Sequence, residues 1–223
     1  LTGLEIADGE LKGITVMDSD GREEHIDTNA VILATGHSAR DTYELIKESA
    51  LEMEQKPLSI GVRMEHSQEL INRAQYGEED RLPPAEYKVS YKASNGRGVY
   101  SFCMCPGGEV VVCSTADGEL CVNGMSNRRR DSGVANSGIL CDVRVSDFDS
   151  DDVLSGVKFQ QKYERLACEN GGGKFNPPTC TMKDFLDANA QSVIASLPDF
   201  AYEAIREAIP FFAEKIHGYD DPD

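Results

Sequence analysis

The chain has 223 residues, of which 40% are apolar, a composition typical of a folded globular protein rather than a disordered one. Its longest uncharged apolar run, around Ala30 to Ala34, is far shorter than the roughly 20 residues of a membrane-spanning helix. A net charge of −17 repels phosphate groups, so neither duplex nucleic acid nor an anionic membrane surface is expected as a partner.

The N-terminal residues predict a β-meander. Three apolar-rich runs cover 4–7, 11–17 and 25–33, and Asp8-Gly9 and Asp20-Gly21 separate them. Asp-Gly between strand-like runs is a strong hairpin signal, because glycine tolerates the positive φ that tight turns demand. We therefore expect antiparallel strands joined by short turns.

A strand and a helix follow the meander. The segment Ala30 to Ala34 is continuously apolar, which is typical of a strand covered on both faces of a parallel sheet. It ends at Thr35-Gly36, and apolar positions at helical spacing then predict a helix over 39–49, with Ser38 as its N-cap. A strand, a glycine turn and a helix N-terminus in this order present backbone N–H groups to an anion.

The remainder predicts an antiparallel sheet with helices. Strands are expected over 58–65, 87–93, 99–105, 109–115, 119–123 and 139–145. Helices are expected over 67–76, 153–169, 181–188 and from Pro198 to 208, with Pro210 breaking or kinking the last one before 211–217. The fold class is therefore α+β: a meander with one parallel-type strand–helix unit in 1–50, then a mixed domain of antiparallel sheet and helices in 51–223.

Cysteines form the most distinctive local pattern. Strand alternation places Cys103 and Cys105 on one face, directly before a Pro-Gly-Gly turn. They are interpreted as buried small hydrophobes, as redox-active thiols or as half of a metal site. Zinc would need two more ligands, with Cys113, Cys121 and Cys141 in neighbouring strands, but C-x-C is not the usual zinc spacing and no metal ligand is assigned. The odd total of seven cysteines and the absence of a signal-peptide pattern indicate a reducing, cytoplasmic setting.

Charged residues around two turns are further candidates. Arg63 and Glu65 point the same way along a predicted strand and are expected to form an ion pair. Arg97 lies between two glycines, where it is expected to be exposed and able to clamp an anion. His66 is a candidate general acid or base near neutral pH, or a cap of the following helix.

Longer strings carry a resemblance to a known family. Val31 to Thr42, Lys56 to His66 and Tyr100 to Gly108 resemble the bacterial FAD-dependent, or NAD(FAD)-utilizing, dehydrogenases. Asn123 to Ser126 and Ala135 to Ser137 resemble the same family. The resemblance runs from about Leu1 to Phe185 and more loosely beyond.

The resemblance implies an FAD domain built from separated chain segments, with a substrate-type domain inserted between them. This sequence would then be an internal fragment, with part of the FAD domain in 1–50 and the inserted domain in 51–223. No G-x-G-x-x-G is present in it, and the family's C-terminal flavin-binding segment is missing. We therefore expect this chain alone to retain no FAD and to be inactive. Its unpartnered apolar strand is expected to lead either to a homodimer through this region or to a shifted local structure around residues 39–49.

Roles for individual residues also follow from the resemblance. The residues expected to contact the flavin nucleotide are Thr35, Gly36, His37, Ser38 and Arg40. The catalytic candidates are Cys103, Cys105 and His66, and the candidates for contact with a small-molecule substrate are Arg97, Arg63 and Tyr100. NAD(P)H is left open as a second partner. The alternative is a non-enzymatic binding or assembly module whose cysteines hold a structural metal.

Overall fold

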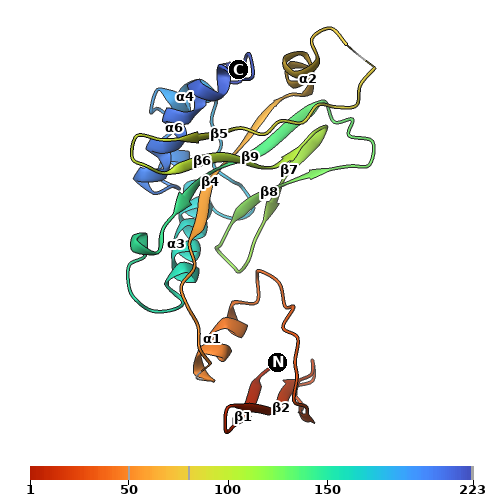
Figure 1. The fold of residues 1–223 in the computed structure, drawn as a ribbon, viewed down its shortest axis with the longest axis vertical. Helices are drawn as coiled ribbons and strands as arrows, with labels where there is room; N and C mark the ends of the chain where they lie inside the picture. The colour runs from red at the N-terminus through yellow and green to blue at the C-terminus, as the bar shows by residue number, and fades with distance from the viewer. Residues whose placement is uncertain (50, 80, 222–223) are drawn as a thin grey trace. The chain divides into compact units, whose positions relative to one another are not determined.

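The computed structural model describes residues 1–49, 51–79 and 81–221, which form two compact units (Figure 1). One unit comprises Leu1–Lys56 with Phe148–Lys158, and the other comprises Pro57–Asp147 with Phe159–Asp223. Antiparallel sheets and helices together make an α+β fold, which confirms the predicted class.

The first unit contains the predicted meander. Strands β1 (Gly3–Ala7), β2 (Glu10–Met17) and β3 (Glu23–Asp27) form an antiparallel sheet in that order. Asp8 and Gly9, with φ of 54° and 77°, make the first turn, as the Asp-Gly signal predicts. Helix α1 (Arg40–Glu48) follows close to its predicted bounds.

Two predictions near α1 are wrong. Residues 30–34 are not a strand, and Ile32 is 92% exposed. A strand needs a neighbour for its backbone groups, but β1, β2 and β3 pair with one another and no strand in the described residues pairs with this segment. Ser38 does not cap α1: Ala39 occupies the N-cap position, without a side-chain hydrogen bond.

A four-stranded antiparallel sheet is the centre of the second unit. Its order is β4 (Leu58–Ser67), β9 (Val134–Val143), β6 (Gly98–Cys105) and β5 (Ser90–Lys92). Residues 58–67 pair with 134–143 without interruption. β5 is shorter than the strand predicted over 87–93, and β9 begins earlier than the strand predicted over 139–145.

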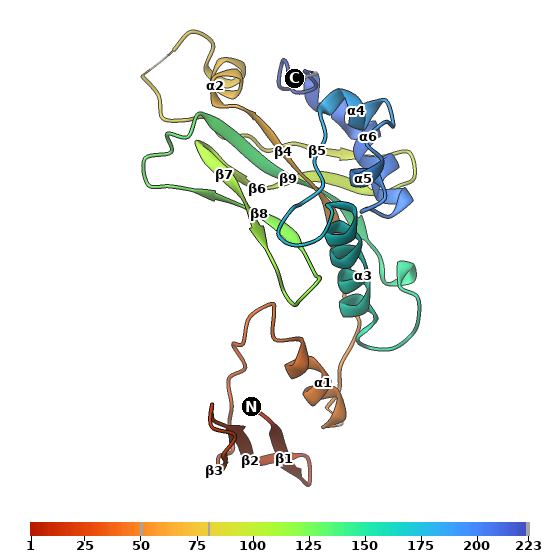
Figure 2. The same cartoon turned by 180° about the vertical axis from the view of Figure 1, so that it is seen from behind.

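Strands β7 (Gly108–Cys113) and β8 (Cys121–Ser126) form a separate hairpin that runs alongside β6 and β9 (Figure 2). The helices are α2 (Gln68–Tyr76), α3 (Ser155–Asn170), α4 (Met182–Leu186), α5 (Gln191–Ile194) and α6 (Asp199–Ala213), with a short 3-10 helix at Val145–Asp147. The Oγ of Ser67 accepts a hydrogen bond from the backbone of α2, and Thr181 caps α4 in the same way.

Of the two effects predicted for Pro210, a break or a kink, the structure shows that the helix is not broken. α6 continues to Ala213 with the proline inside it. Ile209 and Phe212, one on each side of Pro210, are both fully buried. Their packing offsets the backbone hydrogen bond that proline cannot donate.

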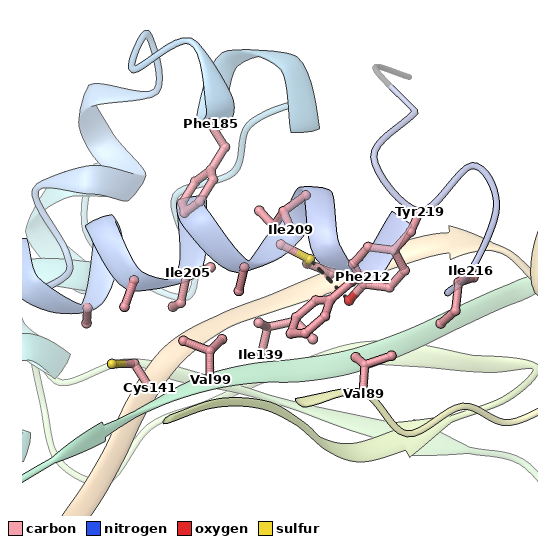
Figure 3. Close-up of a cluster of buried hydrophobic side chains, with 14 of the residues drawn as sticks. Val89, Val99, Ile139, Cys141, Phe185, Ile205, Ile209, Phe212, Ile216 and Tyr219 are labelled. Atoms are coloured by element: carbon pink, nitrogen blue, oxygen red, sulfur yellow. Dashed lines mark hydrogen bonds between the residues drawn. The ribbon is translucent and has the colours of Figure 1, made fainter. Parts of the chain in front are cut away.

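Helix α6 seals one face of the sheet (Figure 3). Ile205, Ile209 and Phe212 lie over Val99 and Ile139, and all five side chains are fully buried. Because successive strand residues face opposite sides, the polar residues that alternate with this core lie on the other face.

Candidate functional site

The face of β4 that looks away from α6 carries Arg63. Val62 and Met64, its chain neighbours, belong to the core side of the strand. Strand alternation therefore directs the Arg63 side chain to the opposite face, where it is half-buried.

The guanidinium of Arg63 joins three separate chain segments. Its Nε donates a hydrogen bond to Oδ1 of Asn136 at 2.7 Å. Its Nη2 donates to the carbonyl oxygen of Cys103 at 2.6 Å and lies 3.3 Å from Sγ of Cys105. These neutral groups, rather than the expected partner Glu65, bind the guanidinium. The β4–β9 register brings Asn136 to the arginine, and the cysteines come from β6, on the other side of β9.

The backbone at the two cysteines forms a bulge and departs from regular strand geometry. The pairing of β6 with β9 shifts between Phe102 and Cys105, and Cys103 has φ of 45°. This left-handed backbone is unfavourable for a residue with a Cβ, and such conformations cluster at functional sites. The predicted alternation is therefore interrupted here. The thiol of Cys103 is exposed, and that of Cys105 is half-buried beside Arg63.

The turn after the cysteines is fixed from several sides. Oε1 of the buried Gln68 accepts a hydrogen bond from the backbone N–H of Gly107 at 2.7 Å. Oγ of Ser126 donates to the carbonyl of Pro106 at 2.9 Å. Gly107 itself has φ of 51°, and a Cβ there would overlap the backbone of Arg130. The turn is a rigid platform for the bulge, and sequence reasoning missed Gln68 as its support.

Gly124 on β8 completes the surroundings of the arginine. A Cβ at this position would overlap the guanidinium of Arg63 and Oδ1 of Asn136. Asn136 is fully buried, and its Nδ2 has no hydrogen-bond partner among the described residues. Sequence reasoning assigned no role to either residue, although both lie in strings that carry the family resemblance.

Arg97 lies elsewhere and is buried, with 8% of its surface exposed, so the expectation of exposure is wrong. Two of its nitrogens donate to the carboxylate of Asp147 at 2.8 and 2.7 Å, and its guanidinium carbon stands 3.7 Å from the centre of the Phe200 ring. The hydrogen bonds from Arg97 hold the pKa of Asp147 below its usual range. The anion that Arg97 clamps is therefore part of its own chain.

His66 is on the core side of β4, away from Arg63. Its Nε2 lies 2.8 Å from the carbonyl oxygen of Tyr219, and its buried Nδ1 has no partner among the described residues. Burial lowers the pKa of His66, while the backbone oxygen of Tyr219 and the charge of Asp221 oppose this effect. The structure thus places His66 against the C-terminal segment rather than beside the cysteines.

Tyr100 is on the Arg63 face of the sheet. Its hydroxyl lies 2.7 Å from Oγ of Ser59, which is four residues before Arg63 on β4 and shares its face. Of the three candidates for substrate contact, Arg63 and Tyr100 share one face of the sheet. Arg97 is buried elsewhere, in an ion pair with Asp147.

Comparison with known proteins assigns the chain to a family. Residues 57–196 match the family model described as FAD-dependent protein, C-terminal domain-like. The chain belongs to this family. It is also 40% identical, over 233 aligned residues, to an uncharacterized protein of Clostridium beijerinckii. That alignment covers 95% of this chain and 43% of the relative, so the chain spans less than half of the relative's length.

An FAD-dependent family raises the question of whether these residues fit the cofactor. Residues 35–38 form an exposed turn before α1, and the space around Gly36, where φ is 81°, is open. The exposure of these residues leaves their backbone accessible to a ligand. The turn does not make a pyrophosphate cradle by itself, because the sequence has no G-x-G-x-x-G and α1 carries Asp41 in its first turn.

Two features of the described residues concern metal binding and membrane insertion. In residues 1–49, 51–79 and 81–221, no group of three or more histidines, cysteines or acidic residues is placed to hold a metal ion. Within the same ranges, no helix has the length and apolar character needed to cross a membrane.

Proposed function

We propose that this chain is the substrate-side portion of an FAD-dependent oxidoreductase that acts on a small molecule in the cytoplasm. The proposal is based on the set of residues from three other strands that surround the guanidinium of Arg63. Cys103 and Cys105 on β6, Asn136 on β9 and Gly124 on β8 all meet its guanidinium. The family match supplies the class of cofactor.

FAD, when bound to the complete protein, supplies the hydride or electron transfer. This chain's residues supply recognition and orientation. Nε and Nη2 of Arg63 are engaged by Asn136 and the cysteine bulge, which leaves Nη1 to hold a carboxylate or carbonyl oxygen of the substrate. Tyr100 presents a hydroxyl on the same face of the sheet.

The two thiols have different surroundings. Cys103 is exposed and contacts the substrate directly, at a backbone position fixed by the bulge. Cys105 lies beside Arg63, 3.3 Å from its Nη2, and is the second candidate for contact with the substrate. NAD(P)H is the proposed electron donor.

The test uses the protein expressed from the complete reading frame that encodes this chain. We expect it to purify with stoichiometric FAD, whereas residues 1–223 alone retain no FAD after incubation with it and removal of the free cofactor by gel filtration. In the complete protein, Arg63→Ala is expected to slow reoxidation of NAD(P)H-reduced flavin by a panel of small-molecule acceptors at least tenfold, with unchanged flavin content. Arg128→Ala, an exposed arginine in the loop after β8, is the matched control.

Two results contradict the proposal. If the complete protein purified without flavin, the proposal that it uses FAD would be wrong. A flavoprotein in which Arg63→Ala, Cys103→Ala and Cys105→Ala all match the wild type with every acceptor would show that this face of the sheet is not the substrate side.

A further inference from the structure

The hairpin of β7 and β8 carries a second pair of cysteines that the proposed function does not use. Cys113 ends β7 and Cys121 begins β8, and the register places them directly opposite each other. Directly opposite residues share one face of a sheet. Gly124 points toward Arg63, so alternation places Cys121, three residues earlier, on the other face of the hairpin.

The spacing of such a pair suits a covalent bond. Opposite residues in an antiparallel ladder have Cα atoms about 4.5 or about 5.5 Å apart, depending on the type of pair. A disulfide spans Cα separations of roughly 4.4 to 6.8 Å. Both cysteines are half-buried, so a small reagent reaches them without unfolding of the strands.

Contacts with α3 hold the two residues that directly precede Cys121. The backbone N–H of Leu120 donates to the carbonyl oxygen of Glu164 at 3.1 Å. The buried carboxylate of Glu119 accepts hydrogen bonds from Gln161 at 3.2 Å and Arg165 at 2.9 Å. These contacts anchor the chain directly before Cys121, and the pairing of β7 with β8 places Cys113 opposite it.

We propose that Cys113 and Cys121 form a dithiol–disulfide site that reacts with small-molecule disulfides such as oxidised glutathione. The thiolate of one cysteine attacks a glutathione sulfur, forms a mixed disulfide and releases one glutathione thiolate. The second cysteine then attacks the protein sulfur of that mixed disulfide and releases the second glutathione thiolate. Both cysteines lose a proton to solvent, and the two electrons reduce oxidised glutathione to two glutathione molecules.

The other cysteines are placed less favourably. Cys141 is fully buried, and burial raises the pKa of its thiol to about 11. Cys168 is also buried, and Cys180 is exposed on a different segment. In the strand ladders of the described residues, Cys113 and Cys121 are the cysteines that stand directly opposite each other. Cys103 and Cys105 are not opposite each other in a strand ladder either, so the pair Cys113 and Cys121 is the one expected to close a disulfide between two strands.

The test is peptide mapping of residues 1–223 after treatment with oxidised glutathione and blocking of remaining thiols with iodoacetamide. Cleavage after arginine, lysine and glutamate separates Val110–Glu119, which contains Cys113, from Leu120–Arg128, which contains Cys121. Cys103 and Cys105 remain together on a third peptide. We expect the first two peptides to be recovered as one disulfide-linked species in at least tenfold excess over any other linked pair.

Single cysteine variants separate the two steps of the reaction, which are formation of the mixed disulfide and its replacement by the protein disulfide. Cys113→Ser and Cys121→Ser are each expected to stop at a stable glutathione adduct on the remaining cysteine, and Cys180→Ser is the matched control with unchanged cross-linking. Recovery of Cys113 and Cys121 as separate adducts in the wild type would overturn the proposal, as would preferential pairing with another cysteine or no reaction before denaturation. Because the readout needs no flavin, failure here is distinguishable from failure of the proposed function.

Discussion

The guanidinium of Arg63 occupies the space that a side chain at Gly124 would need. The hairpin strand β8 can pass over the arginine only because glycine has no Cβ. Gly124→Ala should therefore displace Arg63 from Asn136 and Cys103, and lower the free energy of unfolding by about 1–3 kcal/mol, the usual cost of overpacking.

A double-mutant cycle with Arg63→Ala checks this relationship. Removing the arginine side chain frees part of the overlapping space, so Gly124→Ala should cost less in the Arg63→Ala background. Urea denaturation measures all four proteins. Additive losses would mean that the two residues do not compete for the same space.

Cys103 has a backbone conformation that favours glycine. A residue with a Cβ at φ near 45° has a penalty of about 1–2 kcal/mol. Cys103→Gly should relieve this strain, whereas Cys103→Ala keeps it. We expect the glycine variant to be more stable than the alanine variant by about 1 kcal/mol in urea denaturation. The usual order, with alanine more stable, would show that Cys103 is not held in this conformation in solution.

His66 should make stability depend on pH. Burial holds its pKa below the ordinary value of about 6.5, so the folded state favours the neutral imidazole. Its stabilising contribution is therefore complete above about pH 6.5 and decreases as the pH falls toward and through the folded-state pKa. Tyr87, Tyr219 and Asp221 are the titratable groups around it, and the charge of Asp221 opposes the shift.

The unfolding free energy at about pH 7.5 and about pH 5.5 measures this effect. His66→Gln should reduce the difference between the two values, because glutamine does not titrate. His37→Gln, at an exposed position, is the control. A wild type and a His66→Gln variant with the same pH dependence would exclude the imidazole as its source.

The exposed segment around Ile32 should promote association. Its side chain is 92% exposed, and an unpartnered extended apolar segment tends to recruit another chain. Sedimentation of residues 1–223 should show concentration-dependent dimers that Ile32→Lys abolishes. Phe175→Lys, at another exposed apolar position, should leave association unchanged. A wild type that stays monomeric at every concentration would contradict the prediction.

Local signals in the sequence were sufficient to predict most elements. The Asp8-Gly9 turn gives the first hairpin, and the hydroxyls at Ser67 and Thr181 mark the starts of α2 and α4. Each depends on a few adjacent residues, so their chemistry can be read along the chain. The apolar strand at residues 30–34 was predicted wrongly because strand formation also needs a neighbour.

The candidate site depends on long-range pairing, which no local pattern specifies. Arg63 meets Asn136 only because β4 and β9 pair in one particular register. The burial of Arg97 likewise depends on Asp147, which lies beyond β9. Individual candidates could be proposed from residue type, but which of them meet could not be predicted.

The pairing of β4 with β9 has a kinetic consequence. Residues 58–67 leave the ribosome long before their partners at 134–143, and β5 to β8 are synthesised in between. Contacts of such large sequence separation form slowly, because a long loop must close before they contribute. The edge of β4 therefore stays unpaired until β9 is synthesised, and its apolar side stays uncovered until α6 follows later still. We expect this stretch to be one that chaperones bind on the nascent chain.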